Sequence, residues 1–446
     1  MNTGKKQAVV LIHGVGEQVP MDTLRGFVEA VWTMDFKVRR SWTPGKSWSK
    51  PDQISGDFEL RRITTTENRE RRRTDFFEFY WAHLMQGTTL SQVGAWAKVL
   101  LFRRPSRVPR QLLGIWWTMM ALAVIALAAV VCKAAGILPI PASLLVWGSI
   151  LWLLVGGAIT GLMVNVAGDA ARYLHVAPGN IAIRSGIRQA GIDLLEKLHA
   201  SKEYDRIILV GHSLGSVIGY DILTHLWPRY NSASAPEEGK ENADTAQKAL
   251  EKLAAVPGSA RLDVNEYQRA QSAYFDELQT REKKWLVSDF ITLGSPLAHA
   301  GVLLARDDEE FAMKKAHREF PTCPPVLEVL KGSERFTYRD REEAPKEWRP
   351  NHAAVFAPTR WTNLYFPCQW TMFGDAIGGP VAPAFGPGIR DVPVSTDLRG
   401  GIFAHTLYWT LPKANCGKVP DCITELRKAV RLCETQPPSK SEAEKE

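Results

Sequence analysis

The sequence predicts an α/β fold in which a mostly parallel sheet is flanked by helices and interrupted by an inserted transmembrane hairpin of two helices. Short β-branched apolar runs end in glycine turns, as buried parallel strands do. Segments of helical periodicity accompany these runs. In addition, residues 111–168 contain a single charged residue, Lys133, although charged residues make up 23% of the chain.

A chain of 446 residues has room for one large α/β domain with insertions or for two or three ordinary domains. We predict one large α/β domain in two parts, separated by the hairpin. The predicted boundaries are 1–110 for the first part, ending in an interfacial helix, 111–168 for the hairpin, 169–433 for the second part, about 231–284 and 298–358 for cap-like insertions within it, and 434–446 for a disordered tail.

The first part opens on residues 8–12 (AVVLI), which predict a buried strand followed by the glycine turn His13-Gly14-Val15-Gly16. Residues 57–65 and 75–81 alternate around a charged turn and predict two further strands.

The uncharged run is long enough to cross a membrane twice. Residues 112–131 would span the roughly 30 Å bilayer core at about 1.5 Å per helical residue. Pro139 and Pro141 interrupt the run, and residues 142–167 form a second candidate span. Arginines stand before the first span and Arg172 follows the second, which predicts a two-pass membrane protein with both termini, and the domain outside the hairpin, in the cytoplasm.

Features beside the run predict a lipid bilayer as partner. Residues 90–101 have apolar positions at helical spacing, which indicates an interfacial helix, and the arginines between residues 103 and 110 favour anionic lipid head groups. Gly157 and Gly161 allow close helix packing, within the hairpin or in self-association. Nucleic acid is not expected as a partner, although the formal charge is +7.

No cofactor or metal is expected. The six cysteines form no close CxxC pair and no metal-ligand spacing with histidine, which favours reduced thiols. No P-loop or dinucleotide fingerprint appears. The polar start of the chain does not read as a signal peptide, so a cytoplasmic location is expected for the bulk of the protein.

The central motif is Gly211-His212-Ser213-Leu214-Gly215, between a buried-strand run at residues 206–210 and a helical segment at residues 216–227. The pattern GxSxG alone is common, but this junction is where a strained turn can hold a serine hydroxyl out of a sheet. The following helix directs its dipole and N–H groups toward charge that develops beside the serine. We predict Ser213 as a nucleophile, with a structural turn serine as the alternative.

A serine nucleophile needs a base, and ten histidines are available. His405 lies late in the chain, in a glycine-opened loop that runs into an apolar segment, as the order Ser, acid, His requires. His352 and His299 are the alternatives.

An orienting carboxylate completes a triad. Residues 361–366 (WTNLYF) predict a buried strand, and the loop after it carries Asp375, our candidate acid. Asp391 and Asp397 are closer to His405 in sequence but are interpreted as solvated loop acids.

Two backbone N–H groups are predicted to bind an oxyanion: that of Leu214, after the nucleophile, and that of Val15, which Gly14 allows to approach. A plain tight turn is the alternative at Gly14. Residues 294–296, after a strand-like run, are expected to line the pocket.

These motifs resemble the lipase and esterase branch of the α/β-hydrolase superfamily: HGVG after the first strand, GHSLGS around Ser213, TLGSP at residues 292–296, DAIGGP from Asp375 and AHTLYW around His405. The resemblance implies a Ser213, His405 and Asp375 triad with Leu214 and Val15 as oxyanion donors, acting through an acyl-enzyme intermediate.

The sequence therefore predicts a membrane-anchored serine hydrolase that cleaves acyl esters, with lipids as the expected substrate. Two alternatives remain. One is a hydrolase of soluble esters, thioesters or amides that is only tethered to the membrane, and the other is a non-catalytic membrane scaffold on a hydrolase fold.

Overall fold

The computed structural model describes the chain in segments. They are residues 6–15, 19–35, 46–56, 59–85, 172–174, 178–231, 245–255, 262–280, 284–330, 333–339, 348–368, 374–375, 377–396, 401–411 and 419–432, with the single residues 117, 120, 121, 124, 128, 131 and 135.

An eight-stranded sheet forms the centre of the described structure, in the order β12-β11-β6-β5-β1-β4-β3-β2. The strands from β12 to β4 pair in parallel, whereas β3 and β2 pair antiparallel at one edge. Their bounds are β1 Lys6–Ile12, β2 Ser47–Pro51, β3 Arg61–Thr65, β4 Arg73–Phe79, β5 Arg206–His212, β6 Val287–Leu293, β11 Arg360–Tyr365 and β12 Arg390–Pro393. The predicted mostly parallel sheet flanked by helices is confirmed.

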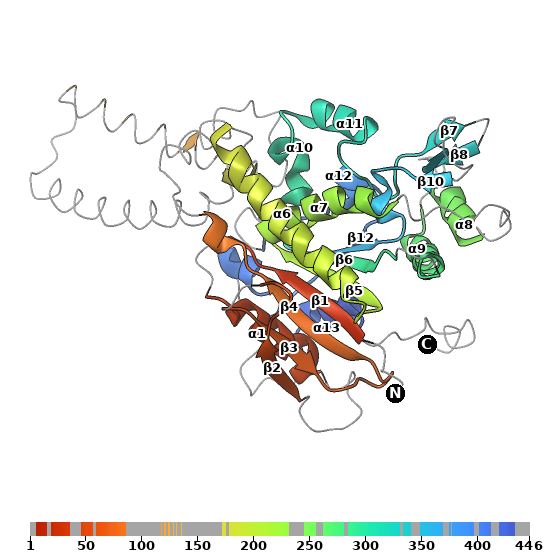
Figure 1. The fold of residues 1–446 in the computed structure, drawn as a ribbon. Coiled ribbons are helices and arrows are strands. Elements are labelled where there is room, and N and C mark those ends of the chain that lie inside the picture. The colour runs from red at the N-terminus through yellow and green to blue at the C-terminus, as the bar shows by residue number, and fades with distance from the viewer. Residues whose placement is uncertain are drawn as a thin grey trace, which may run out of the picture.

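Helices cover both faces of the sheet (Figure 1). One face packs against α6 (Pro178–Ala200) and α7 (Leu214–Leu226), and the other against α1 (Asp22–Val28), the helical turn η1 (Glu29–Thr33) and α13 (Asp421–Val430). Because side chains of a strand alternate between faces, Val10 of β1 faces the first layer and Leu11 the second. Both are buried, which is why these strands read as continuous apolar runs.

Smaller elements lie around the sheet. The predicted insertion at about 231–284 contains α8 (Thr245–Ala254) and α9 (Val264–Leu278). The predicted insertion at about 298–358 contains most of the remaining short elements. Its helices are α10 (Ala300–Leu303), α11 (Asp308–Ala316) and η8 (Ala354–Phe356), and its strand pairs are β7 (Glu328–Leu330) with β8 (Ser333–Arg335) and β9 (Thr337–Arg339) with β10 (Trp348–Pro350). The other short elements are η2 (Ala82–Met85), η5 (Trp227–Arg229), η7 (Pro296–His299), α12 (Ala382–Phe385) and η9 (Gly401–Thr406).

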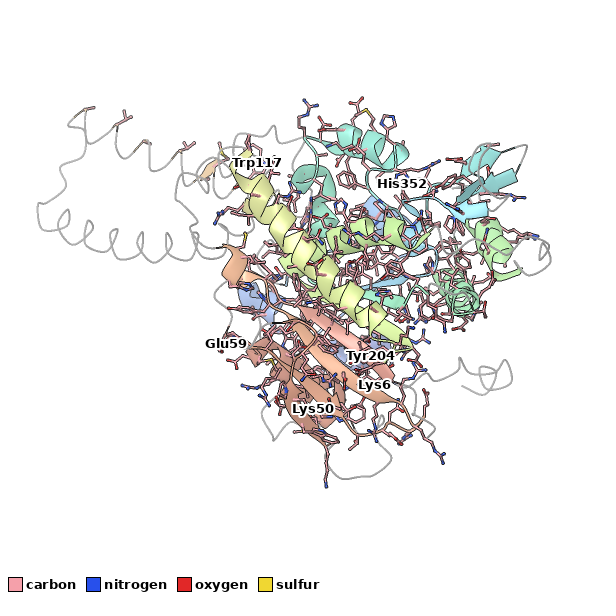
Figure 2. The ribbon with its side chains drawn as sticks, viewed as in Figure 1. Lys6, Lys50, Glu59, Trp117, Tyr204 and His352 are labelled. Carbon is pink, nitrogen blue, oxygen red and sulfur yellow. The ribbon has the colours of Figure 1, made fainter. Side chains whose placement is uncertain are left out.

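A charged cluster joins β1, β3 and β4 at one end of the sheet. The buried Asp75 carboxylate accepts from Lys6 at 2.8 Å, from Arg62 at 3.3 Å and from the Tyr204 hydroxyl at 2.8 Å. Lys6 also lies over the Tyr204 ring, 4.8 Å from its centroid, and the two residues are neighbours in Figure 2. The cluster compensates for burying one carboxylate and ties three strands together.

The predicted hairpin at residues 111–168 lies outside the described residues except for single positions, as do the interfacial helix at 90–101, Gly157 and Gly161. The predicted tail, 434–446, also lies outside them.

Among the helices that the structure describes, none is long and apolar enough to cross a membrane. The longest, α6, has 23 residues, but it carries five charged side chains where a span needs about 20 predominantly apolar residues. Those residues are Arg184, Arg188, Asp193, Glu196 and Lys197. This finding overturns the prediction of a two-pass membrane protein with a cytoplasmic catalytic domain.

Candidate active site

Ser213 occupies a strained turn between β5 and α7. Its backbone has φ 52° and ψ −127°, in the left-handed half of the φ range that side-chain-bearing residues rarely enter. Leu214 begins α7 directly behind it. Such a turn presents a serine side chain above the end of the sheet and against the first turn of a helix, where backbone N–H groups have no partner within the helix.

Two glycines give this turn the space it needs. A Cβ on Gly211 would lie 2.6 Å from the Ser216 Cα, and a Cβ on Gly215 would overlap the Ile12 carbonyl oxygen at the end of β1. The turn therefore packs its backbone directly against itself and against the neighbouring strand. This close packing explains both glycines of the GxSxG pattern, although neither has a positive φ.

His405 and Asp375 are brought together by segments thirty residues apart. His405 lies on η9, and its Nδ1 donates to the Asp375 Oδ2 at 2.8 Å. The other carboxylate oxygen accepts the N–H groups of Ile377 and Gly378, both at 2.9 Å. With the proton on Nδ1, the Nε2 of His405 carries the free electron pair that a general base requires.

Asp375 is 1% exposed, and burial alone would raise its pKa. The hydrogen bonds from His405, Gly378 and Tyr408 outweigh burial and hold the pKa of Asp375 below its ordinary value. The Asp375 carboxylate is therefore negatively charged beside the His405 ring.

Tyr408 is a further member of the site that the sequence reasoning missed. Its hydroxyl donates to the Asp375 Oδ2 at 2.8 Å and accepts the Phe366 N–H at 3.2 Å. No sequence pattern indicates this role, because Tyr408 lies beyond the end of η9 (Gly401–Thr406) and reaches Asp375 through tertiary packing.

The serine turn and the acid–base pair meet at the carboxyl end of β6. The Ser213 N–H donates to the Leu293 carbonyl at 2.9 Å, and Gly294 follows with φ 57°. A Cβ on Gly294 would lie 2.7 Å from the Asp375 Oδ2 and 3.0 Å from the His405 Nδ1. Within the described residues, the Nε2 of His405 is buried and has no hydrogen-bond partner, and no hydrogen bond joins it to Ser213.

His212 connects the serine turn to the histidine segment. Its Nε2 donates to the His405 carbonyl oxygen at 2.8 Å, and the two rings are 5.0 Å apart. Burial lowers the pKa of His212 to about 3, so the ring is neutral near pH 7.

The turn after β1 lies beside the serine: a Cβ on Gly14 would be 3.0 Å from the Ser213 Cβ. His13 holds this turn, because its Nδ1 donates to the Gly14 carbonyl at 2.7 Å while its Nε2 accepts the Trp81 N–H at 3.3 Å. Burial lowers the pKa of His13 to about 4. In a trans peptide the N–H opposes the C=O, so the bond from His13 turns the Val15 N–H away from the His13 ring.

The structure describes three of the four residues that the sequence offered as alternatives for the base and the acid. His352 is exposed (Figure 2), and His299 is buried in η7. Asp391 on β12 accepts from Asn363 at 2.7 Å and from two backbone N–H groups, which is a structural role. Asp397 lies outside the described residues. In the part of the chain that the structure covers, no three His, Cys, Asp or Glu side chains are grouped to hold a metal ion.

No protein-family model matches the chain, and no curated protein or solved structure matches it. The assignment to the lipase and esterase branch of the α/β-hydrolase superfamily is therefore overturned, and what stands is a general α/β fold. The physical reason is that motifs of five or six residues describe a local turn, and the same turn chemistry arises on unrelated chains.

Proposed function

We propose that this protein is a serine hydrolase that cleaves carboxylic acyl esters. Ser213 is the nucleophile, His405 the base and Asp375 the carboxylate that orients it. The N–H groups of Leu214 and Val15 are the oxyanion donors.

The observation that carries the proposal is the meeting of three chain segments at the carboxyl end of β6. The strained serine is bonded to Leu293, and the next residue, Gly294, leaves room for the Asp375–His405 pair only because it has no side chain. The Asp375–His405 distance of 2.8 Å gives the histidine the tautomer that a base needs. A scaffold would have no use for a strained serine, or for a buried histidine Nε2 that has no hydrogen-bond partner among the described residues.

In the proposed reaction, the Ser213 Oγ attacks the ester carbonyl carbon as its proton passes to the His405 Nε2. The carbonyl oxygen takes the negative charge and faces the two N–H donors. The alcohol leaves with the proton from His405, and an acyl-enzyme remains on Ser213. Water then attacks the acyl carbon, His405 takes the proton of the water, and the acid departs as Ser213 regains its proton.

The proposal covers acyl esters in general. The two substrate classes are lipid esters in a bilayer and short soluble esters. Parallel assays with a p-nitrophenyl butyrate solution and with phospholipid vesicles separate the two.

The test is labelling by a fluorophosphonate together with ester hydrolysis, using the full chain. We expect Ser213→Ala to lose the label and at least about 10⁴-fold in kcat. The matched control is Ser201→Ala, because the Ser201 hydroxyl bonds to the Leu198 carbonyl at the end of α6, far along the sheet from the site. Labelling that survives in Ser213→Ala, or the absence of both labelling and hydrolysis in the native chain, would overturn the proposal.

A further inference from the structure

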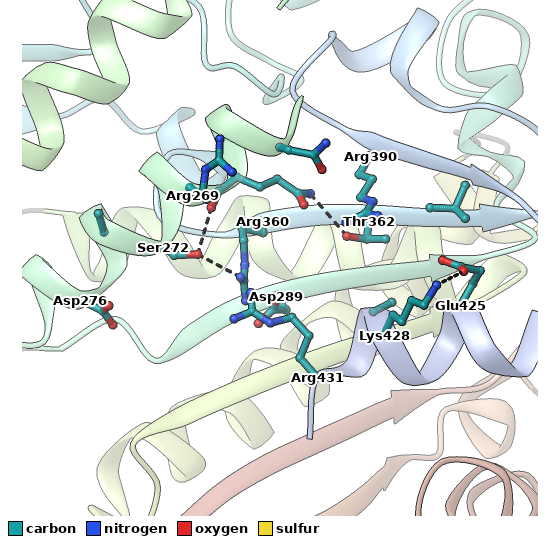
Figure 3. A pocket seen from close by; sticks show the side chains of 15 residues that line it. Arg269, Ser272, Asp276, Asp289, Arg360, Thr362, Arg390, Glu425, Lys428 and Arg431 are labelled. Carbon is teal, nitrogen blue, oxygen red and sulfur yellow. Dashed lines mark hydrogen bonds and ion pairs between the residues drawn. The ribbon is translucent and has the colours of Figure 1, made fainter. Parts of the chain in front are cut away.

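A cavity of about 600 Å³ lies on the face of the sheet that carries α13. Residues of β6, β11 and β12 form its floor, and α9 and α13 form its walls (Figure 3). The volume is in the range of small-molecule sites.

The strand register explains why the floor is polar. Arg360 pairs with Asp289, and Thr362 pairs with Arg390, so these four residues stand side by side on one face. Further along the same strands, Ile291 and Leu364 occupy this face and are covered as part of the core. The amino-terminal ends of β6, β11 and β12 thus present charged groups where their carboxyl-terminal halves present apolar ones.

One arginine in the floor is fixed in place. Arg360 is 7% exposed, and its guanidinium binds the Asp289 carboxylate at 2.6 Å and the Ser272 hydroxyl at 2.9 Å. At the wall, Lys428 of α13 pairs with Glu425 at 2.6 Å. These two pairs neutralise two of the basic residues.

Three arginines remain around the same space: Arg269 from α9, Arg390 from β12 and Arg431 at the end of α13 (Figure 3). None of them has a carboxylate partner among the described residues, and the one other acidic residue of the lining is Asp276 at the exposed side of α9. The Arg431 carbonyl accepts from Arg206 at 2.6 Å, which fixes the backbone from which that side chain extends.

We propose that this cavity binds a small molecule carrying a pyrophosphate group. Guanidinium groups form paired, charge-assisted hydrogen bonds with phosphoryl oxygens, and arginines from three separate elements can surround two linked phosphates. Gln268 and Thr362, which bond to each other at 3.5 Å, offer further polar contacts to the rest of such a ligand. The recess between two helices favours a small molecule over an extended polyanion.

The site is independent of the proposed hydrolase chemistry. Ser213 follows the carboxyl end of β5, whereas Arg360 and Arg390 are the first residues of their strands. A binding measurement therefore tests the cavity whether or not the protein hydrolyses esters.

The experiment is calorimetric titration of the full chain with pyrophosphate at low ionic strength, with inorganic phosphate as the second ligand. We expect saturable binding of one pyrophosphate, at least about tenfold tighter than inorganic phosphate because a second charged group is held. Arg390→Ala and Arg269→Ala should each weaken pyrophosphate binding about tenfold.

Arg61→Ala is the matched control, because this exposed arginine lies on β3, near the opposite edge of the sheet. It should leave binding unchanged. Heat that does not saturate, or equal weakening by Arg61→Ala, would overturn the site. Equal affinity for inorganic phosphate would overturn the assignment of a pyrophosphate group. Circular dichroism of each variant checks that the fold is retained.

Discussion

Strands β6 and β11 carry polar chemistry near both ends, and the two ends differ in how they hold it. At the carboxyl ends, Asp375 and His405 are packed against Gly294, and the nearby ring of His212 is neutral. At the amino ends, Asp289 and Arg360 form a charged pair at the floor of a cavity lined by further arginines. The hydrogen bond between Asp375 and His405 orients one ring nitrogen, as the proposed reaction requires. The excess of arginines around the cavity attracts anions, as the proposed binding requires.

The largest effect is expected at the carboxyl end, from Asp375→Asn. The amide can donate to the His405 Nδ1, which would place the proton on Nε2 and remove the base. We expect kcat for ester hydrolysis to fall about 10³- to 10⁴-fold with little change in stability. The control is Asp421→Asn, because the exposed Asp421 carboxylate accepts the Ser395 N–H and lies outside the candidate site. A loss below tenfold would mean that Asp375 does not orient the base.

At the amino end, we expect Asp289→Asn to act on stability instead. It leaves the Arg360 guanidinium buried without an opposite charge, which costs about 3 kcal/mol of the free energy of unfolding. Glu425→Gln breaks a pair whose Lys428 side chain is 64% exposed, and should cost less than about 0.5 kcal/mol. Urea unfolding of both variants measures the difference. An equal loss of unfolding free energy in the two variants would show that burial adds nothing to the stabilisation by the Arg360–Asp289 pair.

The close packing at the serine turn can be tested with Gly215→Ala. The added methyl group overlaps the Ile12 carbonyl oxygen, so we expect a loss of about 2 kcal/mol in unfolding free energy and weaker fluorophosphonate labelling. Gly186→Ala on α6 meets no atom within 4 Å and should stabilise the protein by about 0.5 kcal/mol. If Gly215→Ala is as stable as Gly186→Ala, the turn has more room than its contacts indicate.

Tyr408→Phe should have the smallest effect, about 1 kcal/mol in the activation free energy for hydrolysis, or roughly fivefold in kcat/KM. Because Tyr408 helps to depress the pKa of Asp375, losing its hydroxyl raises that pKa. The carboxylate is active above its pKa and is lost as the pH falls through it. Near pH 7 Asp375 stays charged in both proteins, so the loss there reports the missing hydrogen bond itself, and an unchanged kcat/KM would contradict this role.

The sequence predicted the parts of the fold that depend on local pattern. Residues 8–12 and 206–210 lie in β1 and β5, and the segment at 216–227 corresponds to α7, because buried strands and helices carry their own apolar periodicity. By contrast, β2 and β12 were not predicted, since their polar sequences are extended only through pairing with neighbouring strands.

The same distinction holds at the candidate site. The glycines around Ser213 mark a turn that sequence alone can indicate, and the late histidine and the glycine-flanked aspartate could be proposed from chain order. Tyr408 could not be found in this way, because its bond to Asp375 depends on tertiary packing. Nor could the cavity, whose three arginines come from elements that the register and the helix positions bring together.

The junction between η2 and the helical residues 172–174 has a consequence for the design of the chain. The Arg172 guanidinium donates to the Met85 carbonyl at 2.9 Å, and Met85 and Tyr173 belong to one buried cluster. Met85 and Arg172 are thus neighbours in space although they are 87 positions apart along the chain. Because the entropy of closing a loop grows only with the logarithm of its length, bringing together two positions so far apart along the chain costs little more than bringing together nearer ones.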